Sequence, residues 1–183
     1  MARLPELDPD TMSPEQRQVY EDIVSGPRGK VQGPFHAWLR SPDLCGRAQK
    51  LGAFCRFGSS LPPRLSELAI LTVARHATCQ VEWYLHEPIA RDAGVADDVI
   101  EDIRNGRVPE FANEDEGAVY AAVTDLLGTH ALSDEAYADA LTLFGERGVV
   151  DLVGIVGYYI LVALTLNGFE VPVPDGAPPP LSD

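Results

Sequence analysis

The sequence has few basic residues and few cysteines for its length. Its 183 residues include 14 lysines and arginines against 28 aspartates and glutamates, which gives a formal net charge of −14. Such a surface repels phosphate backbones and anionic lipid headgroups, so neither nucleic acid nor a membrane is expected as a partner. The 3 cysteines are an odd number without close pairing. This argues against a disulfide framework and predicts a reducing, cytoplasmic compartment.

Motifs that would indicate export or a specific chemistry are also missing. The first residues, MARLPELDPD, contain no apolar core of signal-peptide length, so no export is expected. The chain has no glycine-rich phosphate loop, no nucleophile elbow and no CxxC pair. It also lacks an internal repeat and any convincing alternation of polar and apolar residues with the period of a strand. We therefore expect an all-α fold in one domain.

Start and stop signals divide the chain into a series of helices. Ser13, Pro14 and Gln16 combine an N-cap, a proline in the first turn and a capping box. Glycines and prolines mark the breaks, as in the loop GPRGKVQGP. The domain is expected over residues 13–174, with extended or flexible tails at 1–12 and 175–183. The predicted helices cover 14–25, 35–39, 42–58, two within 66–92, 97–104, 113–127, 133–145 and 149–169.

The last predicted helix, VVDLVGIVGYYILVALTLNGF, approaches a transmembrane span in length and apolarity. Asp151 lies near its start, and Gly154 and Gly157 interrupt it. Small residues permit close approach of another helix, so the preferred interpretation is a buried helix or an oligomer-interface helix rather than a membrane span.

The stretch 66–92 holds the groups with chemical potential. Glu67 lies on a helical face with apolar residues at i+3, i+4 and i+7. Glu82 and His86 are four residues apart and share a face of the next helix, with Cys79 about one turn before Glu82. Two carboxylates, a thiol and an imidazole within so short a segment are typical of acid/base or thiol chemistry.

Each of these residues also has a purely structural interpretation. Glu82 and His86 could form an exposed ion pair, and Glu67 could simply stabilise a helix start. Cys79 could be activated at a helix N-terminus, or it could be buried and inert. Apolar neighbours around Glu82 and His86 favour burial, which would shift both pKa values. A metal site would need a third ligand, and none stands at a recognisable spacing, so no metal is expected.

The order of these four residues resembles the carboxymuconolactone decarboxylase family, which has an alkylhydroperoxidase D-like fold. Redox members of that family carry a glutamate, then a CxxC, then a histidine four residues beyond the second cysteine. Glu67 matches the glutamate, Cys79 the first cysteine, Glu82 the second cysteine and His86 the histidine. The EWYLH segment looks like the EWxxH variant of the family, and the likeness covers most of residues 13–174.

The resemblance implies an oligomeric helical bundle, a trimer or hexamer with its sites near subunit contacts. Because Glu82 replaces a cysteine, it also implies cofactor-free acid/base chemistry, such as decarboxylation, on a small lactone or carbonyl acid. His86 would donate the proton, oriented by Glu82 or Glu67, and Cys79 would line the pocket. One alternative is a thiol peroxidase or redox protein that uses Cys79 alone with an external thiol. The other is a non-catalytic oligomeric binding protein in which these residues form a buried polar network.

Overall fold

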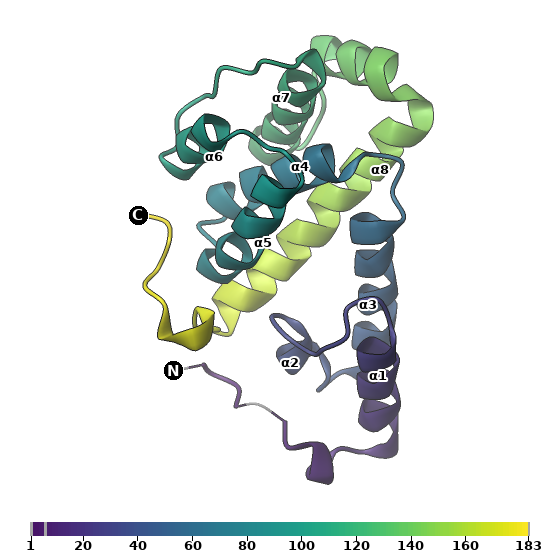
Figure 1. The fold of residues 1–183 in the computed structure, drawn as a ribbon. Helices are drawn as coiled ribbons and strands as arrows, with labels where there is room; N and C mark the ends of the chain where they lie inside the picture. The colour runs from purple at the N-terminus through teal and green to yellow at the C-terminus, as the bar shows by residue number, and fades with distance from the viewer. Residues whose placement is uncertain (1, 6, 183) are drawn as a thin grey trace.

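The computed structural model describes residues 2–5 and 7–182, and helices are the only regular secondary structure in this part of the chain (Figure 1). The all-α prediction is confirmed. The α-helices are α1 (Pro14–Ser25), α2 (Phe35–Trp38), α3 (Pro42–Phe57), α4 (Pro63–His76), α5 (Gln80–Asp92), α6 (Asp97–Arg104), α7 (Glu114–Gly128) and α8 (Asp134–Gly168), with 3-10 turns η1 (Pro9–Thr11) and η2 (Pro174–Gly176).

Capping residues explain where several helices begin. At α1 the Ser13 hydroxyl accepts a hydrogen bond from the Gln16 backbone N–H, and the Gln16 side chain accepts one from the Ser13 N–H. This is the predicted capping box, which satisfies two amides that the helix leaves unpaired. At α8 the Ser133 hydroxyl accepts from the Ala136 N–H at 3.2 Å. At α7 the Asn113 side chain does not cap the backbone, and it donates a hydrogen bond to the Glu116 carboxylate at 3.0 Å.

The long helix α8 was expected as two helices separated by a short connection. In the structure the break is a single residue, Gly145, with φ 67° and ψ 174°. Only glycine tolerates this region of backbone space easily, so Gly145 allows the chain to change direction and resume the helix at once. The two predicted segments are therefore correct, and their separation was overestimated.

Helices α4 and α8 form the centre of the bundle. Every residue of α4 from Leu65 to Ala74 is buried, as expected for a helix enclosed on all sides. In Figure 1, α8 runs diagonally between α3 on one side and α4 and α5 on the other, and it contacts all three as well as α7.

By length and composition alone, α8 could cross a membrane. Its most apolar window has a mean hydropathy of 2.2, yet 61% of that window is buried against the rest of the protein. The buried Asp151 carboxylate accepts hydrogen bonds from the backbone N–H and the hydroxyl of Ser60, both at 2.7 Å. Asp151 thereby fixes the loop before α4, which is a role in a packed protein core.

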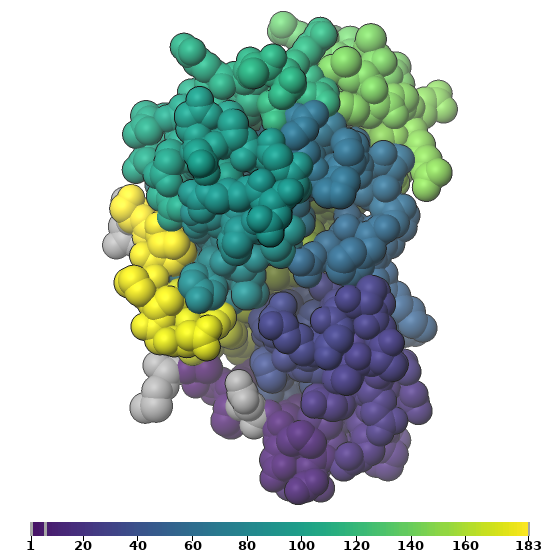
Figure 2. Space-filling model, viewed as in Figure 1, coloured from purple at the N-terminus to yellow at the C-terminus, as the bar shows by residue number. Residues whose placement is uncertain are grey.

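The described segments before α1 and after α8 both contact the bundle. The backbone N–H of Arg3 donates to the carbonyl of Phe169 at 2.9 Å. The C-terminal segment, yellow in Figure 2, returns along α5 and α6. Its Leu181 side chain is buried. Gln80 holds the backbone of Leu181 at both its N–H and its carbonyl.

Candidate active site

A tight turn between α4 and α5 places the chemically active residues. The turn passes through Thr78, whose φ of 45° lies in the left-handed region that β-branched residues rarely adopt. The Cys79 N–H donates to the Ala74 carbonyl at 2.8 Å and closes the turn. The two helices then pack side by side, so residues of α4 face residues of α5.

The Glu67 carboxylate on α4 contacts the imidazole of His86 on α5. The distance between Glu67 Oε2 and His86 Nδ1 is 2.7 Å, and both side chains are buried. Because a carboxylate accepts hydrogen bonds, it holds a proton on Nδ1 and leaves Nε2 as the reactive nitrogen. The ring of Tyr159 packs edge-on against the imidazole, with centroids 5.1 Å apart, and fixes its plane.

This geometry excludes two of the structural interpretations. Glu67 does not mark a helix start, because α4 begins at Pro63 and Glu67 lies one turn further in. His86 does not form an exposed pair with Glu82, since its hydrogen-bonding partner is Glu67 and all three side chains are buried. Of the two carboxylates expected to orient His86, Glu67 is the one in contact.

Glu82 is 1% exposed, and neither of its carboxyl oxygens has a hydrogen-bond partner among the described residues. Burial raises the pKa of Glu82 well above its usual value, and the nearby Glu67 carboxylate raises it further. Interaction with the Cys79 thiol opposes the shift only in part. Glu82 therefore favours the neutral carboxylic acid, a form that can donate a proton.

Cys79 is the N-terminal cap of α5, as the sequence indicated, but it is fully buried. Burial raises the pKa of its thiol to about 12, and the Glu82 carboxyl contributes to the increase. Desolvation thus outweighs the favourable helix dipole. The expectation that Cys79 lines the pocket is wrong, because the cavity beside Glu82 and His86 is lined by other residues.

That cavity has about 60 Å³ open to the centres of water molecules, enough for several waters or a small organic group. Glu82 and His86 form part of its wall, together with Tyr158 and Tyr159 of α8. Burial raises the pKa of Tyr158 to about 12 and that of Tyr159 well above its usual value, so both phenols stay protonated. Two arginines, Arg28 and Arg56, also line the cavity and are partly exposed at its edge.

Sequence reasoning missed four residues that line the cavity outside the motif, namely Tyr158, Tyr159, Arg28 and Arg56. Tyr158 and Tyr159 carry polar groups inside an otherwise apolar run, which was a usable signal for a site on that helix. Arg28 lies in a glycine- and proline-rich loop, where no periodicity indicates the direction of a side chain. Arg56 stands near the end of α3, where an exposed position was the simplest expectation.

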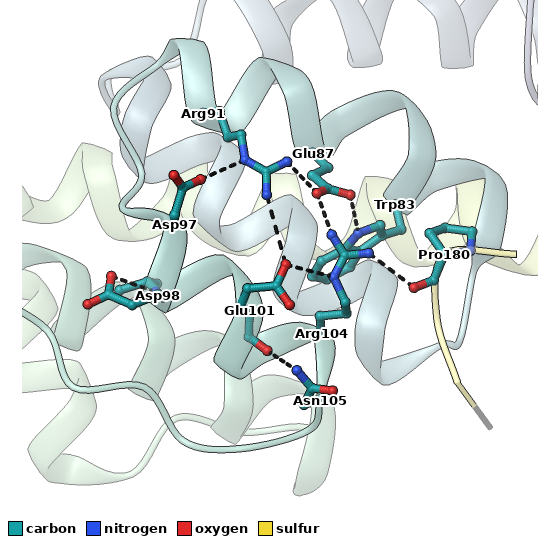
Figure 3. Close-up of polar contacts among 10 residues, drawn as sticks. Trp83, Glu87, Arg91, Asp97, Asp98, Glu101, Arg104, Asn105 and Pro180 are labelled. Carbon is teal, nitrogen blue, oxygen red and sulfur yellow. Dashed lines mark hydrogen bonds and ion pairs between the residues drawn. The ribbon is translucent and has the colours of Figure 1, made fainter.

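The opposite side of α5 is fixed by a charged network (Figure 3). The indole N–H of Trp83 donates to Glu87 at 2.8 Å, and Glu87 also pairs with Arg104 and Arg91. The Arg104 guanidinium lies over the Trp83 ring at 5.2 Å from its centroid. These contacts connect α5 to α6. They fix the orientation of α5 about its own axis, so that Glu82 and His86 point inward.

No group of three or more His, Cys, Asp or Glu side chains that could hold a metal ion occurs among residues 2–5 and 7–182. Glu67, Glu82 and His86 offer one nitrogen and two carboxyl groups, and Cys79 offers a buried thiol. Carboxyl, imidazole and thiol groups can each exchange protons.

Comparison with known proteins gives a family match over part of the chain and a shared fold over most of it. The profile of the carboxymuconolactone decarboxylase family matches residues 42–125, which include all four motif residues. The match ends before α8. No significant match was found among curated protein sequences.

Solved structures resemble the chain over most of its length. The apo debrominase Bmp8 has a TM-score of 0.74 at 15% identity and covers 94% of this chain and 92% of its own. An Agrobacterium tumefaciens protein of unknown function, suggested to be the antioxidant defence protein AhpD, has 0.68 at 17% identity, covering 78% and 99%. An uncharacterised peroxidase-related protein from Silicibacter sp. TM1040 has 0.71 at 14% identity, covering 91% and 87%.

Similarity at these levels of identity shows a shared fold and does not indicate a shared reaction. The sequence match and the fold agree with the resemblance drawn from Glu67, Cys79, Glu82 and His86. Residues 42–125 match the carboxymuconolactone decarboxylase family, and the fold of the chain is alkylhydroperoxidase D-like.

Proposed function

We propose that the protein is an acid/base enzyme that acts on a small lactone or carbonyl acid, by decarboxylation or a related proton transfer. The observation that carries the proposal is the Glu67–His86 pair beside the unpaired carboxyl of Glu82 at one cavity. A buried polar group without a partner is costly, so its presence in a cavity wall supports a role in binding or catalysis.

The three residues have separate roles in the proposed reaction. When the substrate loses carbon dioxide, the bond to the carboxyl carbon breaks and its electron pair passes into the neighbouring carbonyl, forming an enolate. Neutral Glu82 donates a hydrogen bond to the enolate oxygen. Protonated His86, stabilised by Glu67, delivers a proton from Nε2 to the carbon and is reprotonated from solvent. An isomerisation would use His86 first to remove a proton and then to return it.

The one-cysteine redox alternative has weaker support. A peroxidase needs a thiolate that peroxide can reach. Cys79 is fully buried and the pKa of its thiol is about 12, so the thiolate is scarce at neutral pH. The names of the structural relatives, a debrominase and antioxidant-type proteins, describe those proteins at identities of 17% or less.

The non-catalytic alternative requires the polar residues to satisfy one another in a closed network. Glu82 is unpaired, and no hydrogen bond links the Tyr158 or Tyr159 hydroxyl to another described residue. The cavity also reaches the surface beside the partly exposed Arg28 and Arg56. Free hydrogen-bonding groups at an accessible cavity favour a ligand over a purely structural network.

The test is turnover of a panel of small lactone acids and keto acids, followed by carbon dioxide release and proton exchange. With an active substrate in hand, His86→Gln is expected to lower kcat by about 100-fold or more. Glu67→Gln is expected to lower kcat less and to shift its pH profile. His76→Gln is the matched control, since His76 ends α4 outside this cavity. Full activity of His86→Gln would remove His86 from the mechanism.

We also propose that the protein assembles as a homo-oligomer, a trimer or hexamer, in the cytoplasm. Support comes from apolar side chains that remain exposed on two neighbouring helices, α3 and α8. Burying such a patch against a second copy is favourable, and Arg56 at the cavity lies next to its edge. The exposed side chains are Leu51, Phe54 and Phe57 on α3 and Val150, Val153 and Leu164 on α8.

A further inference from the structure

Arg28 presents unpaired hydrogen-bond donors at the cavity. It lies in the loop between α1 and α2, and its guanidinium carbon stands 5.0 Å from the centroid of the Phe35 ring. Its Nε and Nη2 atoms are buried and have no hydrogen-bond partner among the described residues. Burying charged donors without an acceptor is unfavourable, so this arrangement indicates a position where an acceptor binds.

The two unpaired nitrogens belong to the same edge of the guanidinium group. Nε–H and the adjacent Nη2–H point in parallel, and their spacing matches the two oxygens of a carboxylate. The Phe35 ring next to the guanidinium restricts rotation of the group, which keeps this edge in place. A planar carboxylate therefore fits the donors better than a single-atom anion.

Gly52 on α3 makes room for this arrangement. A methyl group at Gly52 would lie 2.6 Å from Arg28 Nη2 and 2.1 Å from the Tyr158 hydroxyl oxygen. Both groups thus approach the bare backbone of α3 at one point, where no side chain fits. The Tyr158 hydroxyl is protonated and adds a third donor beside the arginine.

The charges around the cavity also favour a negative ligand. Arg28 and Arg56 have no carboxylate partner in the described part of the chain, although 28 acidic residues are available in the sequence. Glu82, the acidic residue in the cavity wall, favours its neutral form. The cavity edge is therefore positive inside a protein of net charge −14.

We propose that Arg28, assisted by Tyr158, binds the carboxylate of a small planar organic acid and sets its position relative to His86. Arg28 is a specificity residue outside the family motif, and Gly52 is the backbone opening that lets it reach the cavity. The substrate class named here rests on the proposed acid/base function of the same site.

The test uses binding without turnover, on the full-length protein. 2-Furoate is the probe, and its uncharged counterpart 2-furamide is the comparison, both titrated by calorimetry or NMR. We expect 2-furoate to bind and 2-furamide to bind at least about tenfold more weakly. Arg28→Gln should weaken 2-furoate at least about tenfold, and Arg28→Lys should fall between it and the wild type. Arg47→Gln, which removes an arginine whose side chain is 80% exposed, should leave affinity unchanged.

Several outcomes would overturn the proposal. The wild-type protein could fail to bind 2-furoate, or it could bind the acid and the amide equally well. A folded Arg28→Gln variant could also bind 2-furoate with unchanged affinity. Tighter binding of inorganic phosphate than of 2-furoate would replace the carboxylate with a tetrahedral anion and would also overturn it. The result is separate from the acid/base proposal, because loss of activity in His86→Gln and unchanged binding in Arg28→Gln can occur together.

Discussion

At the scale of single residues, Glu82 is the most unusual group in the protein. It occupies the position of a cysteine in redox members of the family it resembles, and it is buried beside a second carboxylate without a hydrogen bond. Burial and the Glu67 charge both favour its protonated form. A neutral acid at that position is a suitable donor to an enolate oxygen, and it has a cost in stability that can be measured.

Glu82 should make the protein less stable as pH rises. In the unfolded chain its carboxyl titrates near 4.5, whereas in the folded protein the pKa is well above that value. Above about pH 4.5 the unfolded state therefore holds fewer protons than the folded state, and the free energy of unfolding falls until pH passes the folded pKa. The slope from this group is at most about 1.4 kcal/mol per pH unit.

Urea denaturation of the wild type and of Glu82→Gln from pH 5 to 8 checks this sign. The glutamine variant keeps the shape of the neutral acid but does not titrate. The free energy of unfolding of the variant should therefore rise relative to that of the wild type as pH increases. Glu146→Gln, a change at an exposed glutamate of α8, should follow the wild type throughout. A constant difference between Glu82→Gln and the wild type would show that Glu82 titrates normally.

The sequence located the residues of the site better than their environments. The spacing of Glu67, Glu82 and His86 was sufficient to bring them together once two packed helices were expected. The thiol pKa of Cys79 could not be predicted from the sequence. A helix N-terminus lowers a thiol pKa, whereas burial raises it, and burial depends on tertiary packing. The place of Arg28 in the site could not be predicted for a related reason, because a loop has no periodic pattern that indicates where a side chain points.

At the scale of elements, helix boundaries followed local signals closely. The predicted segments 14–25 and 97–104 match α1 and α6, because N-caps, prolines and glycines act within a few residues. The break at Gly145 was shorter than expected, since a single glycine can redirect the backbone. The path of the C-terminal tail depends on contacts with residues 80–104, far away in sequence, which no local signal contains.

Gln80 should hold the C-terminal tail on the bundle. Its amide donates to the Leu181 carbonyl at 3.1 Å and accepts from the Leu181 N–H at 2.9 Å. Gln80→Ala is expected to cost about 1 kcal/mol and to lower Tm by roughly 2–4 °C, because water replaces both bonds at this partly buried position. Hydrogen exchange of the last residues should become faster.

The control is Gln18→Ala, since Gln18 bonds only to the exposed Asp22 on α1. This variant should leave both Tm and tail exchange unchanged. If Gln80→Ala kept the wild-type exchange of Leu181, the burial of the leucine side chain rather than the paired hydrogen bonds would be what holds the tail.

At the scale of the whole molecule, the fold class was accessible from the sequence. Helical periodicity without strand alternation predicted the all-α class, and the four motif residues predicted the family resemblance that the match over residues 42–125 supports. The oligomeric state could not be predicted in the same way. An apolar helix has the same sequence pattern whether it is buried within its own chain or against a partner subunit. The structure separates these faces of α8 into a buried side and an exposed side.

Assembly should depend on the exposed side of α8. Leu164 is 67% exposed, and Leu164→Glu is expected to shift the protein to a smaller species, because a charge placed in an apolar contact is strongly unfavourable. Light scattering coupled to size-exclusion chromatography gives the mass of each species. Val108→Glu, at a 76% exposed position in the loop before α7, should not change it. A wild-type monomer at tens of micromolar would contradict the assembly proposal.

The two cavity arginines lie within a chain of net charge −14. An anionic ligand therefore approaches through a repulsive field and meets attraction only at the mouth of the cavity. Mobile ions screen distant exposed charges more strongly than a partly buried pair at contact. Added salt should accordingly speed the encounter of such a ligand with this protein, which is the reverse of ordinary electrostatic steering.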